Sequence, residues 1–359
     1  MKDNDENYIK ICFRLAKRGI GFVSPNPLVG SIIVKNNIII GKGYHKKYGA
    51  PHAEINAIKN STESVNGATL YCNLEPCCHI KKKTPPCVPF IIENNIKRVV
   101  ISNLDSNPIV NGNGIRELKE AGIEVRTGVL YEEGALLNQF YFNVVKTGLP
   151  FINVKIAQSL DGKISSVKNR RTNISSSESQ KFVHRLRSEY DALLVGSNTV
   201  IVDNPLLTVR NVRGRNPIRI IIDRTLKIPL NNNVCNLSDK GNTWIITSTK
   251  TSVKKIKKFK DKGIQVLCLS ENKNQEITLL SILRSLKSRG ISSLLVEGGQ
   301  SIFSQFVRNN YWNKITLIQS PLIFGRGVNT FHLSKSNSVK INTVSRIGED
   351  VILEILPNS

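Results

Sequence analysis

The chain has 359 residues, a formal net charge of +24 and a hydrophobic fraction of 40%. This length and apolar content are enough for about two globular domains, each with its own core. No stretch reaches the roughly 18 consecutive apolar residues of a transmembrane helix, and the polar start of the chain lacks the apolar segment of a signal peptide. We therefore expect a cytoplasmic protein with no membrane partner.

The positive charge is spread along the chain and has no regular set of aromatic residues interleaved with it. Five lysines between residues 254 and 260 illustrate this, since Phe259 is the one aromatic residue among them in this solvated segment. We attribute the positive charge to a compositional bias rather than to nucleic-acid binding. The charge would also attract small anionic substrates to some extent. Seven cysteines, an odd number gathered mainly between 72 and 87, indicate metal binding in a reducing compartment rather than a disulfide framework.

The first 150 residues alternate between helical and strand patterns. Helices are expected at 8–18, from about 52 onward, at 86–93 and at 114–121. Strands are expected at 28–34, 38–44, 68–74, 97–102 and 123–127, with a hairpin turn at Asn36-Asn37. Strands that alternate with helices predict a three-layer α/β domain.

The pattern restarts after a boundary near residues 146–150. Strands are expected at 151–157, 192–196, 217–223, 244–247, 265–269, 293–297 and 314–320. Helices are expected at 178–188, 252–261, 277–288 and 299–308. We therefore predict a first domain over residues 1–147 and a second α/β domain over residues 148–359.

The densest chemistry lies between His52 and Cys87. His52-Ala53-Glu54 is followed by Pro76-Cys77 and, after a Pro-bounded loop, by Cys87. One imidazole and two thiolates would fill three positions on a catalytic zinc and leave the fourth for water, and a carboxylate such as Glu54 would move the proton. This order is the signature of zinc nucleobase deaminases, although the thiols here are more widely spaced. The alternative is that His52 and Glu54 cap a helix and that the cysteines are buried thiols.

The second domain lacks the Gly-x-Gly-x-x-Gly fingerprint of dinucleotide-binding folds. It does contain Glu297-Gly298-Gly299 between a strand and a helix, where glycines let a phosphate approach the helix start. Arg187 and Arg210 offer planar forks for a phosphate, but each could equally be a solvated surface charge.

Several ordered motifs make the chain resemble the bifunctional riboflavin-biosynthesis family, with an N-terminal pyrimidine deaminase and a C-terminal pyrimidine reductase. They are Pro25-Asn26-Pro27-Leu28-Val29-Gly30, Pro51-His52-Ala53-Glu54, Leu74-Glu75-Pro76-Cys77, Thr84-Pro85-Pro86-Cys87, Asp105-Ser106-Asn107-Pro108, Ser159-Leu160-Asp161-Gly162, the run from Asp203 to Arg210, and Val296-Glu297-Gly298-Gly299. The resemblance implies a cytidine-deaminase-like domain followed by a dihydrofolate-reductase-like α/β domain. It also implies Zn²⁺ and NADPH as cofactors, a small phosphorylated pyrimidine as substrate, and a homo-oligomer.

The resemblance also implies roles for individual residues. The metal ligands would be His52, Cys77 and Cys87, with Glu54 catalytic. The deaminase substrate would contact Asn26, His45, Lys83, Asp105 and Asn107. The reductase substrate would contact Arg171, Arg187, Leu207, Arg210 and Glu297. NADPH would contact Ala157, Asn173, Thr199, Asp203, Arg224, Gly299, Gln300, Ser301, Ile302, Phe303, Ser304 and Gln305.

The chain departs from the family pattern at two places. The loop between the ligand cysteines is one residue longer and lacks its usual Gly, so that Cys78 rather than Cys77 would restore the usual spacing. We choose Cys77, because Pro76 and the preceding strand fix its direction. Arg171 and Asn173 stand where the family usually has Ser and Trp.

Three other functions fit parts of the pattern. A tRNA adenosine deaminase would use a close Cys-x-x-Cys pair and lack the second domain. A deaminase with a silent reductase domain would explain Arg171 and Asn173. A non-enzymatic zinc scaffold would need a fourth protein ligand and would have no use for Glu54.

Overall fold

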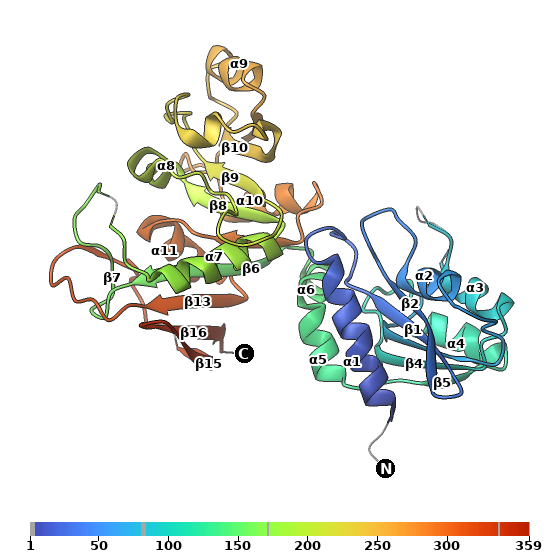
Figure 1. The fold of residues 1–359 in the computed structure, drawn as a ribbon. Coiled ribbons are helices and arrows are strands. Elements are labelled where there is room, and N and C mark those ends of the chain that lie inside the picture. Colours follow the sequence, from blue (N-terminus) through green and yellow to red (C-terminus); the bar gives the residue numbers. More distant parts are fainter. Residues whose placement is uncertain (1–3, 80–83, 171, 337, 359) are drawn as a thin grey trace. The chain divides into compact units, whose positions relative to one another are not determined.

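The computed structural model describes residues 4–79, 84–170, 172–336 and 338–358. The chain divides into two compact units, Met1–Gly148 and Leu149–Ser359. Figure 1 shows that each unit is built around its own sheet. No helix among the described residues is both long and apolar enough to span a membrane.

The first unit is a five-stranded sheet with helices on both faces. Its strands are β1 (Gly30–Lys35), β2 (Ile38–Tyr44), β3 (Thr69–Leu74), β4 (Arg98–Asn103) and β5 (Glu124–Arg126). Its helices are α1 (Asn4–Ala16), the short 3-10 turn η1 (Lys17–Gly19), α2 (Ala53–Lys59), α3 (Cys87–Glu93), α4 (Asn113–Glu120), α5 (Tyr131–Leu137) and α6 (Gln139–Thr147). The strand order is β2-β1-β3-β4-β5; β1 runs antiparallel to β2 and β3, while β3, β4 and β5 are parallel.

Alternate strand residues supply the two cores of this unit. Ile33 and Leu70 belong to a buried cluster with side chains of α2, α3 and α4. Their neighbours Ile32 and Tyr71 face the other way, into a cluster with side chains of α1. Because side chains alternate between the faces of a strand, this division places helices on both sides of the sheet. The predicted three-layer arrangement is confirmed.

The contact between α2 and β2 depends on a glycine. A Cβ at Gly43 would lie 2.3 Å from the carbonyl oxygen of Ala53 and 2.4 Å from the amide nitrogen of Ala57. A residue without a side chain is therefore needed for α2 to pack this closely on β2. This packing sets the position of His52, the residue immediately before α2.

The second unit contains a nine-stranded sheet and a separate two-stranded sheet. Its strands are β6 (Phe151–Gln158), β7 (Lys163–Ser165), β8 (Ala192–Gly196), β9 (Ile218–Ile222), β10 (Thr243–Ser248), β11 (Gln265–Leu269), β12 (Ser293–Val296), β13 (Lys314–Gln319), β14 (Val328–Asn329), β15 (Val339–Ile347) and β16 (Asp350–Pro357). Its helices are α7 (Ser177–Glu189), α8 (Ser197–Asp203), α9 (Val253–Asp261), α10 (Leu279–Lys287) and α11 (Gln300–Arg308), with 3-10 turns η2 (Asn233–Cys235) and η3 (Lys240–Asn242).

The strand order is β11-β10-β9-β8-β12-β6-β13-β16-β15, and a separate two-stranded sheet pairs β7 with β14. The strands from β11 to β13 are parallel, and the β15–β16 hairpin is added antiparallel at one edge. Helices α10 and α11 bury their apolar faces in one cluster, whereas Val183 of α7 joins Ile318 and Ile352 in another. The second α/β unit is thus also as predicted.

The sequence patterns did not reveal every element. Helices α5, α6 and α8, the hairpin β15–β16 and the short strands β7 and β14 were not predicted. The first helix begins at Asn4 rather than near residue 8. The other predicted elements are present with ends shifted by a few residues at most.

Candidate functional site

Three side chains predicted to bind metal converge in the first unit. His52 precedes α2, Cys77 lies in the loop after β3, and Cys87 is the first residue of α3. The Nδ1 atom of His52 lies 3.4 Å from the Sγ of Cys77 and 3.4 Å from the Sγ of Cys87. All three ligand atoms lie within 4.8 Å of one another.

This geometry fits a tetrahedral zinc ion. Zn–S bonds of about 2.3 Å and Zn–N bonds of about 2.0 Å, at tetrahedral angles, place nitrogen and sulfur about 3.5 Å apart. The two N···S distances of 3.4 Å agree with that separation. The cluster contains one imidazole and two thiols from the described part of the chain, so it leaves a coordination position for water, as a catalytic site requires.

Hydrogen bonds connect the segments that carry the two thiols and orient the ring of His52. The backbone amides of Cys87 and Val88, at the start of α3, donate to the carbonyl oxygen of Cys77 at 2.9 and 3.2 Å. The hydroxyl of Thr84 lies 3.1 Å from Nε2 of His52, which leaves Nδ1 directed at the thiols. Such a contact on the second ring nitrogen is how proteins orient a metal-binding histidine. The half-buried Cys78 is not part of the cluster.

The predicted proton carrier is buried beside this cluster. Glu54 is the second residue of α2 and only 3% exposed. It follows His52 by two residues, so the N-cap and the first turn of one helix present the two groups. A buried carboxylate next to a metal-bound water is suited to proton transfer.

Two predicted substrate residues contact each other next to His52. The side-chain amide of Asn26 lies 3.1 Å from Nε2 of His45, whose Nδ1 lies 3.2 Å from the carbonyl oxygen of Pro51. The rings of His45 and His52 are 5.2 Å apart between centroids. Burial lowers the pKa of His45, which is 2% exposed. His45 therefore offers a neutral hydrogen-bonding group rather than a cation.

Two further predicted substrate residues lie on the loop after β4, where the amide of Asn107 donates to Oδ1 of Asp105 at 2.9 Å. Lys83, the predicted cation for the substrate phosphate, lies outside the described residues.

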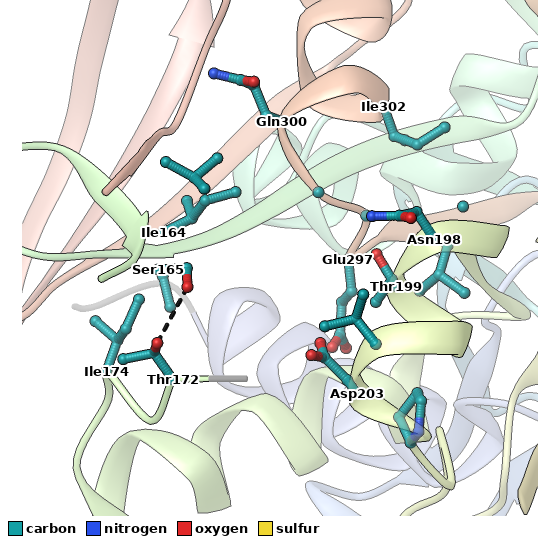
Figure 2. A pocket seen from close by; sticks show the side chains of 18 of the residues that line it. Ile164, Ser165, Thr172, Ile174, Asn198, Thr199, Asp203, Glu297, Gln300 and Ile302 are labelled. Atoms are coloured by element: carbon teal, nitrogen blue, oxygen red, sulfur yellow. Dashed lines mark hydrogen bonds between the residues drawn. The ribbon is translucent and has the colours of Figure 1, made fainter. Parts of the chain in front are cut away.

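The second unit holds a cavity of about 1330 Å³. Figure 2 shows Glu297 facing Thr199 and Asp203 of α8, with Gln300 at the start of α11. Most residues predicted to contact the reductase substrate or NADPH line it: Ala157, Asn173, Arg187, Thr199, Asp203, Leu207, Arg210, Glu297, Gly299, Gln300, Ser301, Ile302 and Phe303. The opposite wall includes Ile164 and Ile174, and the hydroxyls of Ser165 and Thr172 are 3.1 Å apart there (Figure 2).

An ion pair lies at the wall of the cavity. Arg187 donates from Nε and Nη2 to the two carboxylate oxygens of Glu297 at 2.8 and 2.7 Å. The side chains are only 13% and 9% exposed. Burial opposes the charge of Glu297, but Arg187 and Lys155 outweigh that effect and lower the pKa of the carboxyl. Both partners are therefore charged, and much of the fork of Arg187 is already occupied by Glu297.

Lys155 is a residue that the sequence patterns did not single out. It lines the cavity from β6. Burial lowers the pKa of its ammonium group; the negative charge of Glu297 opposes this shift, and the positive charge of Arg187 increases it. A lone lysine in the apolar strand Phe151–Gln158 was the available signal. An ammonium group with a lowered pKa can donate a proton at neutral pH more readily than an ordinary lysine.

The turn before α11 is tight. A Cβ at Gly298 would lie 2.6 Å from the Cβ of Ile302, so only glycine fits there. Gly299 is the N-cap of α11 and lines the cavity. This helix start presents backbone N–H groups to the cavity, which suits a phosphate.

Some predicted cofactor residues do not line the cavity. Arg224 pairs with Glu271 at 3.0 Å. Ser304 is buried and its hydroxyl accepts from the amide of His332, and Gln305 donates to Ser301. The cofactor roles of these three residues remain predictions. Arg171 lies outside the described residues.

Two family models match the chain. The cytidine and deoxycytidylate deaminase zinc-binding region matches residues 2–103, and the RibD C-terminal domain matches residues 150–353. The riboflavin biosynthesis protein RibD of Aquifex aeolicus is 41% identical, with 98% of each chain covered, and that of Escherichia coli is 32% identical over 98% of this chain and 99% of its own.

Solved structures agree with these matches over the whole chain. RibD of Acinetobacter baumannii has a TM-score of 0.88 at 30% identity, with 99% of each chain covered. A deaminase/reductase of Thermotoga maritima has a TM-score of 0.86 at 36% identity and the same coverage. The chain therefore belongs to the RibD family of bifunctional riboflavin-biosynthesis enzymes.

Proposed function

We propose that the two activities of this bifunctional deaminase and reductase are carried by separate domains, the deaminase by residues 1–147 and the reductase by residues 148–359. The ranges of the two family models support this division. The enzyme uses Zn²⁺ and NADPH. It deaminates 2,5-diamino-6-ribosylamino-4(3H)-pyrimidinone 5′-phosphate and then reduces the ribosyl group, which yields 5-amino-6-ribitylaminouracil 5′-phosphate.

In the deaminase domain, His52, Cys77 and Cys87 hold the zinc ion. The observation that carries this assignment is the convergence of His52 Nδ1 with both thiols at 3.4 Å. Zinc, when bound, supplies a Lewis acid that lowers the pKa of water to about 7. Glu54 accepts a proton from that water on its carboxylate and delivers it to the departing amine. Asn26, His45, Lys83, Asp105 and Asn107 hold the pyrimidine phosphate.

In the reductase domain, the cavity holds NADPH against the substrate sugar. NADPH, when bound, supplies the hydride. The backbone amides at the start of α11 bind its phosphates, and Asp203 and Thr199 contact it from α8. Hydride addition to C1′ of the ribosylamine would break the bond between C1′ and the sugar ring oxygen, so that this oxygen would need a proton, and Lys155 would donate it beside the charged pair of Glu297 and Arg187. Arg210 contacts the substrate from the same wall of the cavity.

The other functions considered above have less support. Family models of both activities match the chain, which disfavours a lone tRNA or nucleobase deaminase and a zinc scaffold. The open cavity with its charged wall disfavours a silent reductase. We further propose that the enzyme is cytoplasmic, assembles as a homo-oligomer and has no nucleic-acid partner.

The test is a stoichiometric assay on the purified zinc-loaded chain. With the diaminopyrimidine phosphate as substrate, we expect one ammonia released and one NADPH oxidised per molecule converted. Ammonia release without NADPH oxidation would mean that only the deaminase works. Failure to release ammonia from a chain with one zinc per protein would refute the proposed function.

A further inference from the structure

The helices that end the first unit lie outside both family models. The zinc-binding model ends at Asn103 and the RibD C-terminal model begins at Pro150, so neither model covers α5 or α6. Nevertheless, a side chain of α6 and the residue between the two helices contact segments that carry predicted substrate residues of the deaminase.

The first contact comes from Tyr141 of α6. Its hydroxyl donates to Oδ1 of Asp105 at 2.8 Å, the same oxygen that accepts from the amide of Asn107 at 2.9 Å. Asp105 is 6% exposed, so its carboxylate has little room for other orientations. Burial raises the pKa of Asp105, and the hydrogen bonds from Asn107 and Tyr141 offset part of that rise.

The backbone of the loop that carries Asp105 is held by Glu75. Glu75 accepts from the amides of Asp105 and Gly112 at 3.2 and 3.1 Å on Oε2 and from the amide of Ile115 at 3.3 Å on Oε1. Glu75 lies two residues before Cys77. The loop with Asp105 is therefore tied to the segment that carries a predicted zinc ligand, which leaves the orientation of the carboxylate itself to Asn107 and Tyr141.

The second contact comes from Asn138, between α5 and α6. Its side-chain oxygen accepts from the amide of Leu28 at 2.8 Å, and its side-chain nitrogen donates to the carbonyl oxygen of Leu28 at 3.0 Å. Asn138 is 2% exposed, and Leu28 follows Asn26 by two residues. Asn138 and Tyr141, three residues apart, thus contact the two segments that carry the predicted substrate residues Asn26 and Asp105.

We infer that Tyr141 is a positioning residue of the deaminase, which fixes the Asp105 carboxylate so that it can accept hydrogen bonds from the amino and ring N–H groups of the pyrimidine. The hydrogen bonds from the Asn107 amide and the Tyr141 hydroxyl both end on Oδ1, and we therefore assign Oδ2 to the substrate. A carboxylate already fixed in this orientation loses less entropy on binding than a mobile one. The inference rests on the proposed deamination.

The variant Tyr141→Phe removes only the hydroxyl and keeps the ring in the helix. We expect the deaminase KM for the diaminopyrimidine phosphate to rise about 10-fold, which corresponds to about 1.4 kcal/mol of binding free energy, with kcat within about 3-fold of the wild type. Reductase kinetics on the deaminated pyrimidine should be unchanged and serve as an internal control. Tyr131→Phe is the matched control, since Tyr131 is 53% exposed on α5 and its recorded hydrogen bond uses only the backbone carbonyl.

A second measurement separates positioning from a general effect on stability. On an Asp105→Ala background, which lacks the oxygen that accepts from the Tyr141 hydroxyl, Tyr141→Phe should raise KM by less than about 2-fold, because coupled residues do not act additively. A full additional rise would show that Tyr141 does not act through Asp105. A loss of melting temperature or active fraction with KM unchanged would show that the hydroxyl only stabilises the helix, and would overturn the inference.

The outcomes also distinguish the inference from its premise. Wild-type protein that releases no ammonia from the pyrimidine overturns both the proposed function and the inference. Wild-type deamination with an unchanged KM in Tyr141→Phe overturns the inference alone.

Discussion

The substitution Asp5→Asn is expected to destabilise the deaminase domain through a charge cluster that fastens α1 to the sheet. The Asp5 carboxylate accepts from Arg98 Nη1 and Nη2 at 3.0 and 2.8 Å, from Arg126 Nη1 at 2.7 Å and from Tyr71 Oη at 2.7 Å. Its side chain is 6% exposed, and asparagine would keep the shape but remove the charge.

The expected loss follows from the burial of each partner. Removing one member of a fully buried ion pair costs about 3–5 kcal/mol because the other charge is left unpaired. Here Arg98 and Arg126 are 24% and 44% exposed, so water can compensate both in part. We therefore expect a loss of about 2 kcal/mol in the free energy of unfolding, or about 4–8 °C in melting temperature for a domain of this size.

The effect should depend on pH in a defined direction. Burial opposes the charge of Asp5, but the hydrogen bonds from Arg98, Tyr71 and Arg126 prevail and lower its pKa from 3.8 to about 2. A carboxyl with a lowered pKa contributes stability above its ordinary pKa, and that contribution is lost as the pH falls through the folded value. The difference between wild type and Asp5→Asn should therefore be constant near neutrality and shrink between about pH 4 and pH 2.

Calorimetry of the zinc-loaded chain measures this effect in the transition that accompanies loss of deaminase activity. Glu6→Gln, at the exposed neighbouring position on α1, is the matched control and should shift that transition by less than about 0.5 kcal/mol. An Asp5→Asn variant as stable as this control would refute the reasoning, as would a difference that grows at low pH.

Four further substitutions test the two sites. Cys77→Ser should reduce the zinc content measured by mass spectrometry well below one per chain, while Cys78→Ser should not; the reverse pattern would show that the longer loop had shifted the ligand. Asn173→Trp should tighten NADPH binding about 10-fold in a fluorescence titration, because an aromatic ring at the cavity wall adds packing against the cofactor. An unchanged Kd would show that Asn173, in place of the usual Trp, does not weaken NADPH binding. Arg224→Ala should change the NADPH Kd less than about 2-fold, since Arg224 pairs with Glu271 rather than lining the cavity; a loss above 10-fold would support its predicted cofactor contact.

The sequence predicted elements that carry strong local signals. Apolar runs identified the strands of both sheets apart from the hairpin β15–β16. Ser176 and Thr278, whose side chains cap α7 and α10, lie at helix starts that the patterns also suggested. Helices α5, α6 and α8 begin without a side-chain cap, and Leu130 before α5 has a left-handed backbone. Helix starts of this kind lack one of the usual sequence signals.

The candidate sites were predictable to the extent that their residues form recognisable motifs. The spacing of His52 and Cys87 suggested that they meet, and the structure brings their atoms together. The link between Tyr141 and Asp105 spans 36 residues and depends on how α6 packs, so no local pattern reveals it. Lys155 also depends on tertiary context, since its proximity to Glu297 arises from the pairing of β6 with β12.

The measurement that tests the account most directly is the activity of Glu54→Gln in both reactions. If Glu54 moves the proton in deamination, ammonia release should fall by about 10³-fold, because general acid–base catalysis contributes about 10²–10⁴-fold. Zinc content should remain at one per chain, and NADPH-dependent reduction of the deaminated pyrimidine should remain at the wild-type rate. Near-normal ammonia release by this variant would contradict the proposed mechanism, and parallel loss of both activities would contradict their assignment to separate domains.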